Sequence, residues 1–150
     1  MKLCIFQSKQ IPEDEIQIHT HPINLSIAKL INIQEETPSI EVYDGRTHSQ
    51  KLISLTKIES FQAMDQYCQV RLMNQETYLY QKRLKTLSNL ETYGFCQINH
   101  SEIISLNQID RFSVEKHARL ALTTYSNNEY IVSRHYQKVL KERLNNETVL

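Results

Sequence analysis

The sequence contains only two glycines among its 150 residues. Glycine-rich phosphate-binding loops need backbone amides that no side chain shields, so this scarcity excludes that kind of nucleotide site. Long apolar runs are lacking as well, and none approaches the roughly 18 residues that a membrane-spanning helix needs. The N-terminus turns acidic at residues 13–15, before the apolar region of a signal peptide develops. These absences predict a cytoplasmic protein.

Neither charge is in excess, since 17 basic residues balance 17 acidic ones. This balance argues against a polycation that coats nucleic acid without sequence preference. Two short basic clusters nevertheless stand out, at 82–85 and 134–143. A neutral chain with such local basic patches can still contact phosphates.

The three cysteines lie far apart and form no CxxC pair: Cys4, Cys68 and Cys96. This spacing is typical of buried thiols in a reducing compartment. A metal site would have to combine His48 with His19 and His21, which share one face of a strand. No cysteine or carboxylate of matching spacing completes that set, so we expect no metal and no cofactor. No motif that activates a nucleophile is present either, and the protein is therefore predicted not to be an enzyme and to have no small-molecule substrate.

Alternating segments predict two antiparallel strand pairs. The segment 67–72 alternates between apolar and polar residues, and a short turn leads from it into 77–81. The segment 118–125 alternates again, and Asn127-Asn128 supplies turn residues before 129–133. This spacing of short strands predicts a mainly β fold. We expect three tyrosines in these strands to pack rather than to stack on bases: Tyr78, Tyr80 and Tyr125.

The two glycines mark a predicted turn and a predicted helix end. Gly45 follows Asp44, which is a hairpin signal between strands near 40–55. Gly94 follows leucines at helical spacing in 84–93, so we expect it to end a helix. A second short helix is predicted after Arg134, with four residues on its inner side: Tyr136, Val139, Leu140 and Leu144.

Residues 1–37 differ from the rest, and Thr37-Pro38-Ser39 is a plausible boundary. Strand-like segments at 2–6 and 15–20 precede an apolar stripe with helical spacing: Ile23, Ile27, Leu30 and Ile31. The sequence therefore predicts a small β/α segment at 1–37 and a main domain at 38–150. The stripe would pack on the main domain, or pair with a second copy or a partner.

Four segments of the main domain resemble the LytTR family of bacterial DNA-binding domains, in the family's order: "IESFQAMDQYCQV", "YLYQKRLKTLSNL", "GFCQINHSEIISLNQIDRF" and "YIVSRHYQKVLKERL". The resemblance implies an elongated, antiparallel β domain with two short helices. In this family, loops rather than a recognition helix enter successive major grooves on one side of the DNA.

Carried over by position, the resemblance implies base contacts by Gln66, His100 and Arg134. Arginine can bond bidentately to guanine, glutamine can do so to adenine, and histidine can donate to an acceptor edge. Four further residues would contact phosphates: Ser101, Ser133, His135 and Lys138. The polar segment 99–101 would then be a loop tip, and apolar residues would anchor its strands: Phe95, Ile98, Ile103, Leu106 and Ile109.

This sequence departs from the family pattern at Gln62, at Asn99-His100 and at Ile104-Ser105. The family usually has an acidic residue at the first place, His followed by a basic residue or Asn at the second, and Val-Asn at the third. The framework survives these changes, whereas the preference for a DNA sequence depends on them.

The 37 residues before the match are too few for a receiver domain of roughly 100–150 residues. The resemblance therefore implies a stand-alone transcriptional regulator that binds tandem direct repeats of double-stranded DNA as a homodimer. Such regulators are often restrained by a small membrane protein. The alternative is a protein-interaction module that kept the fold and lost DNA binding, which the altered Asn99-His100 corner and the zero net charge would permit.

Overall fold

The computed structural model of the chain describes residues 7–12 and 38–147. In the first of these segments, the Ile11 amide donates to the Ser8 carbonyl over 3.3 Å and closes a turn. Several predictions lie outside the described residues: the strands at 2–6 and 15–20, the apolar stripe at 23–31, Cys4, His19 and His21. Among the described residues, none of the helices has the length and hydrophobicity of a membrane span.

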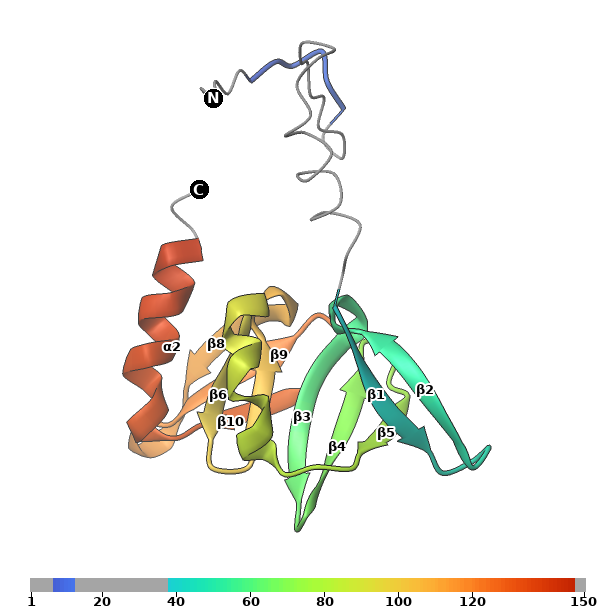
Figure 1. Ribbon diagram of the computed structural model, residues 1–150. Helices are drawn as coiled ribbons and strands as arrows, with labels where there is room; N and C mark the ends of the chain where they lie inside the picture. The colour runs from blue at the N-terminus through green and yellow to red at the C-terminus, as the bar shows by residue number, and fades with distance from the viewer. Residues whose placement is uncertain (1–6, 13–37, 148–150) are drawn as a thin grey trace. The chain divides into compact units, whose positions relative to one another are not determined.

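Residues 38–147 fold into ten strands, four 3₁₀-helices and one α-helix (Figure 1). The strands are β1 (Ser39–Asp44), β2 (Ser49–Ser54), β3 (Ile58–Met64), β4 (Tyr67–Leu72), β5 (Thr77–Tyr80), β6 (Phe95–Asn99), β7 (Glu102–Ser105), β8 (Ile109–Val114), β9 (Leu120–Thr124) and β10 (Glu129–Val132). The helices are η1 (Leu55–Lys57), η2 (Leu84–Tyr93), η3 (Leu106–Gln108), η4 (Lys116–Ala118) and α2 (Arg134–Glu147). The predicted mainly β class is confirmed, as are helical segments at both predicted places.

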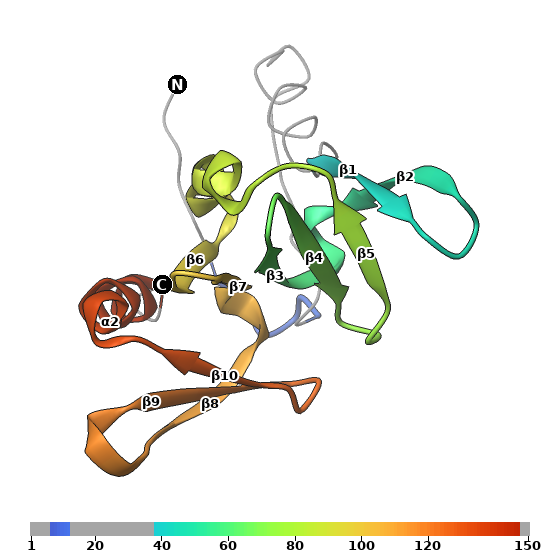
Figure 2. The same cartoon turned by 90° about the horizontal axis from the view of Figure 1, so that it is seen from below.

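The strands form two antiparallel sheets. The larger sheet has seven strands in the order β2-β1-β5-β4-β3-β7-β6, and the smaller has three in the order β10-β9-β8. The sheets meet where β6 lies beside the end of β10, and there the Ser133 amide donates to the Ile98 carbonyl over 2.9 Å. Figure 2 shows the smaller sheet and α2 on the side of the larger sheet where β6 and β7 lie. The domain is thus built of two sheets, with β10 of the smaller one beside β6 of the larger one.

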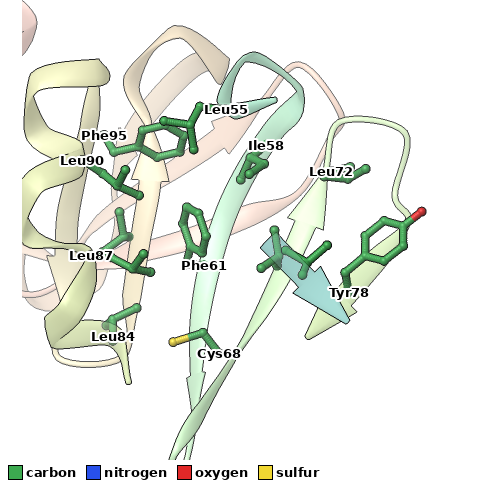
Figure 3. Close-up of a cluster of buried hydrophobic side chains, with 13 residues drawn as sticks. Leu55, Ile58, Phe61, Cys68, Leu72, Tyr78, Leu84, Leu87, Leu90 and Phe95 are labelled. Atoms are coloured by element: carbon green, nitrogen blue, oxygen red, sulfur yellow. The ribbon is translucent and has the colours of Figure 1, made fainter. Parts of the chain in front are cut away.

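Two apolar cores hold the domain together. In the first core, η2 covers one face of the larger sheet, with its leucines directed toward Phe61 and Phe95 (Figure 3). The rings of Phe61 and Phe95 meet edge to face, with centroids 5.6 Å apart. The second core joins β6 and β7 to the smaller sheet and α2: Cys96, Ile98, Ile104, Leu106, Leu120, Leu122, Tyr130, Val132 and Leu140.

The hairpin of β6 and β7 lies between the two cores. Phe95 and Ile103 belong to the first core, whereas Ile98 and Ile104 belong to the second. Because both faces of this hairpin are buried, its strands have apolar runs instead of a simple alternation. The predicted anchors are buried, apart from Ile109, which is half-buried.

The helix predicted before Gly94 is a 3₁₀-helix ten residues long. Side chains three residues apart lie above one another in a 3₁₀-helix. The spacing of exactly three in Leu84, Leu87 and Leu90 therefore places all three in the core. Gly94 has the left-handed φ of 84°, and its amide donates to the Glu91 carbonyl over 3.2 Å. The predicted helix end at Gly94 is confirmed.

Gly45 lies in the predicted turn between β1 and β2, but the left-handed residue of this four-residue loop is His48, with φ of 52°. The turn is organised by Asp44, whose buried carboxylate accepts from the Arg46 amide over 2.9 Å and from Lys51 Nζ over 3.0 Å. These contacts, the backbone amide foremost, hold the pKa of Asp44 well below its usual range.

Three details of the sequence analysis are wrong. Val139 is 47% exposed, because the buried side of α2 consists of residues four apart, Tyr136, Leu140 and Leu144. Tyr125 is 66% exposed, because it follows β9 in a turn instead of lying within the strand. The strand begins at Leu120 rather than at residue 118, since Ala118 has a left-handed φ of 58°.

The two described cysteines, Cys68 and Cys96, are buried and form no disulfide. Burial raises the pKa of the Cys68 thiol to about 11. A thiol in this environment stays protonated at neutral pH and reacts slowly. The prediction of buried thiols is confirmed for these two residues.

Candidate nucleic-acid interface

The three predicted base contacts lie in three separate connections between strands or helices. Gln66 is exposed in the two-residue turn 65–66 between β3 and β4, and His100 is exposed in the two-residue turn 100–101 between β6 and β7. Arg134 is the exposed first residue of α2. Figure 1 shows both turns and the start of α2 along the lower margin of the domain. We call this margin, formed by residues 65–66, 100–101 and 134–138, the turn edge.

Asn99 organises the turn that carries His100. Its Oδ1 accepts from the Ser101 amide over 2.8 Å, which closes an Asx turn. Its Nδ2 donates to Glu102 Oε2 over 2.7 Å and to the Ile131 carbonyl over 3.0 Å. The Asn-x-Ser pattern at 99–101 is a sequence signal for such a turn. Sequence reasoning treated Asn99 as a departure from the family pattern and did not predict this role. The structure shows that this side chain fixes the turn and attaches it to β10.

Aromatic contacts bring His100 to the first turn of α2. The His100 and Tyr136 rings meet edge to face, with centroids 5.9 Å apart. His135 makes a similar contact with Tyr136 over 5.0 Å. Two histidines that are 35 positions apart in the sequence thus flank one tyrosine ring. Gln66 lies on a different hairpin, and no hydrogen bond or ring contact joins it to them within the described residues.

The loop between β8 and β9 holds the start of α2. Arg134 Nη2 donates to the His117 carbonyl over 3.2 Å, and Gln137 Nε2 donates to the Ala118 carbonyl over 3.2 Å. His117 and Ala118 have left-handed φ values of 65° and 58°. This conformation is unfavourable for residues with a Cβ, and neither residue type signals it in a sequence. Sequence reasoning therefore missed the loop that positions Arg134.

The four predicted phosphate contacts differ in exposure. Ser101, His135 and Lys138 are exposed on the turn edge. The Ser133 hydroxyl is instead buried and lacks a hydrogen-bond partner in the described part of the chain. A phosphate contact by this hydroxyl does not fit the structure as it stands, because the hydroxyl is buried. Ser133 contributes through its amide, which joins the two sheets.

The start of α2 is the most basic part of the turn edge. Besides Arg134, its first turns carry His135 and Lys138 and no acidic residue. The N-terminus of an α-helix also presents unpaired amides and a partial positive charge, which favour phosphates. Beside it lies a groove of about 590 Å³, which three basic residues line together with Ile131, Val132 and Ser133: His117, Arg119 and Arg134. The other two turns each include or adjoin a carboxylate, at Asp65 and Glu102.

Metal ligands are not grouped in the described part of the chain, where no three His, Cys, Asp or Glu side chains are placed to hold an ion. His48 Nδ1 instead shares a hydrogen bond of 3.0 Å with the Tyr43 hydroxyl. The described part of the chain thus offers exposed hydrogen-bonding side chains on the turn edge, and no grouped metal ligands.

Comparison with known families matches residues 48–145 to the LytTr DNA-binding domain. The chain belongs to the LytTR family. The match begins just before β2 and ends within α2, so it includes all three connections of the turn edge and leaves β1 outside. No curated protein matches this chain significantly.

A solved LytTr DNA-binding domain from Bacillus cereus has the same fold. It superposes with a TM-score of 0.63 at 18% sequence identity, over 71% of this chain and 95% of the solved one. The LytTR domain of this chain thus keeps the fold of that solved domain with few identical residues.

Proposed function

We propose that this LytTR protein is a sequence-specific transcriptional regulator in the cytoplasm that inserts its turn edge into successive major grooves of DNA. The observation that supports this proposal is the exposure of Gln66, His100 and Arg134 on three separate connections along one margin. Base recognition at several points along a duplex needs such a row of exposed hydrogen-bonding side chains on a rigid framework.

Each side chain suits a different contact. Arg134 would form a bidentate contact with guanine, and Gln66 would form one with adenine. His100, whose turn lies between the other two connections along the turn edge (Figure 1), would donate to an acceptor on a base edge. Lys138, His135 and Ser101 would contact phosphates on either side. Since the turns are tight and hydrogen-bonded, the protein would meet DNA with little rearrangement of its backbone.

Tandem direct repeats would be bound by two copies in the same orientation, each placed about one helical turn or a multiple of it from the other. Selection of bound duplexes from a random pool by the full chain, followed by footprinting, tests this. We expect enrichment of two similar elements whose centres are about 10–10.5 base pairs or a multiple apart. Absence of any enriched sequence at low salt would reject the proposed function.

A protein-interaction module remains a second candidate, because the net charge is zero and carboxylates lie in or beside two of the three turns. The same selection discriminates the two functions. A small membrane protein that restrains the regulator would be a partner under either function. Co-purification from membranes with a product of a neighbouring gene would identify it.

A further inference from the structure

A polar cluster lies between the two sheets at the end of β10 that is remote from Arg134. It joins the bulged start of β3 with two turns, 73–76 between β4 and β5 and 125–128 between β9 and β10. We call it the polar joint and define it by seven residues: Glu59, Ser60, Met73, Gln75, Ser126, Asn128 and Tyr130.

Glu59 is the centre of the polar joint and is fully buried. Its Oε2 accepts from Asn128 Nδ2 and from the Tyr130 hydroxyl, each over 2.7 Å. Because the Tyr130 hydroxyl gives its only hydrogen to Glu59, the 2.8 Å contact with Ser60 Oγ has Ser60 as the donor. Glu59 Oε1 has no partner among the described residues. Two directional hydrogen bonds therefore hold Glu59, at the start of β3 in the larger sheet, to residues of the smaller sheet and its turn.

The two turns are bonded to each other as well. Asn128 Nδ2 donates to Gln75 Oε1 over 3.0 Å, Gln75 Nε2 donates to the Ser126 carbonyl over 3.0 Å, and Ser126 Oγ donates to the Met73 carbonyl over 2.9 Å. Side chains and backbone from both sheets thus alternate in one network. These bonds are directional, and they link the two turns and β3 at several points, so they restrain how one sheet is oriented against the other.

Between the polar joint and the turn edge, the two sheets are separated by a polar groove of about 230 Å³. The groove is lined by Ser60 and Tyr130 of the joint and by Gln62, Gln69, Arg71, Glu102 and Glu129. Apolar packing therefore does not fix the angle between the sheets along this side. At the polar joint, the two sheets are again in direct contact through hydrogen bonds.

We propose that the polar joint is a positioning device for DNA recognition, with Glu59 and Asn128 as positioning residues. The smaller sheet carries Arg134 at the end of β10, and the larger sheet carries Gln66 and His100. By fixing one sheet against the other, the joint sets the spacing of base contacts that the protein accepts. This inference rests on the proposed function and adds a determinant of specificity that does not touch DNA.

The test compares the full wild-type chain with Asn128→Ala on the duplex that the wild type selects from a random pool. Loss of base preference in Arg134→Ala and in His100→Ala first locates the base pair that each residue contacts. One base pair is then inserted between these positions, which moves one contact by about 3.4 Å and a tenth of a turn.

For the wild type, the insertion should weaken binding roughly 5- to 150-fold, the effect of losing one bidentate contact. For Asn128→Ala, we expect this spacing penalty to be at least threefold smaller, while affinity for the original duplex changes less. Asn89→Ala is the matched control, since Asn89 is exposed on η2 and outside the joint. An equal spacing penalty in the wild type and folded Asn128→Ala would overturn the inference.

A measurement without DNA separates failure of the inference from failure of the proposed function. Residual dipolar couplings of amides in β3–β4 and in β9–β10 should fit one alignment tensor in the wild type. In Asn128→Ala the β9–β10 amides should need a second, weaker tensor, and a single tensor would contradict the inference.

If the wild type selects no sequence, the proposed function fails, and the inference that rests on it fails too. Should Asn128→Ala not fold, Gln75→Ala removes two bonds of the joint from an exposed position and takes its place.

Discussion

The smaller sheet is attached to the larger one in two chemically different ways, at opposite ends of β10. At the end that leads into Arg134, the attachment is mainly the second core, with Leu140 of α2 fully buried in it. Two hydrogen bonds accompany it there, from the Ser133 amide to Ile98 and from Asn99 to Ile131. At the other end it is the polar joint around Glu59. Burial of apolar surface is strong but has no direction, whereas hydrogen bonds have both length and angle. We therefore expect the apolar attachment to supply most of the stability, whereas the polar joint adds directional bonds at the end of β10 where a groove separates the sheets.

The largest effect should come from the apolar attachment. Leu140→Ala removes a fully buried side chain, and we expect it to lower the free energy of unfolding by about 2–5 kcal/mol. Val139→Ala is the matched control on the same helix, because Val139 is 47% exposed, and it should change stability by less than about 1 kcal/mol. Urea denaturation measures both. Similar losses for the two variants would mean that α2 is not anchored through Leu140.

Removing one hydroxyl from the polar joint should have a smaller effect. Tyr130→Phe keeps the ring in the second core and removes the donor to Glu59, so we expect a loss of about 1–3 kcal/mol. Tyr125→Phe is the control, since Tyr125 is 66% exposed, and its effect should be within about 0.5 kcal/mol. Urea denaturation at pH 7 compares them. Equal stability of Tyr130→Phe and wild type would show that the joint does not stabilise the fold through this bond.

The same variant predicts a dependence on pH. Burial, together with the Glu59 carboxylate, raises the pKa of Tyr130. A raised pKa means that the unfolded chain loses this proton first, so the stability that Tyr130 contributes is present below about pH 10 and declines above it. The difference in unfolding free energy between wild type and Tyr130→Phe should therefore shrink as the pH rises above about 10. A constant difference from pH 8 to 11 would contradict this.

At the turn edge, substitution should alter binding and leave stability almost unchanged. Arg134→Ala should lower affinity for the selected duplex by about 1–3 kcal/mol, roughly 5- to 150-fold, with little change in non-specific binding. The control is Lys57→Ala, because Lys57 precedes β3 and so lies at the end of that strand away from the turn 65–66. Gel shifts of wild type and both variants on the selected duplex and on a scrambled duplex measure the specific and the non-specific affinity. An unfolded variant, or unaltered specificity, would reject the role of Arg134.

The smallest effect should come from a phosphate contact. Lys138→Ala should weaken binding to all duplexes alike and reduce the slope of log affinity against log salt by about 1. The measurement is a salt titration of wild type and variant on both duplexes. A change in base preference with an unaltered slope would mean that α2 does not lie against the DNA backbone.

The local features of this protein could be predicted from its sequence. Alternation fixed β4 at residues 67–72, and leucines spaced by three together with Gly94 fixed the position and end of η2. The family pattern indicated the connections that carry Gln66, His100 and Arg134, and those connections lie along one margin. The strand and the helix depend on neighbours within a few residues, where side-chain period and backbone preference act directly, whereas the three connections came from the family resemblance.

Which polar groups are buried, and which partners they bind, depends on the fold of the whole domain. Nothing next to Glu59 in the sequence marks it as the centre of a joint, because its partners Asn128 and Tyr130 lie 69 and 71 positions away. The same reason separates Tyr125, which is exposed, from Tyr130, which is buried, although both lie near one turn. The burial of a side chain depends on what the fold places across from it, and local sequence does not contain that information.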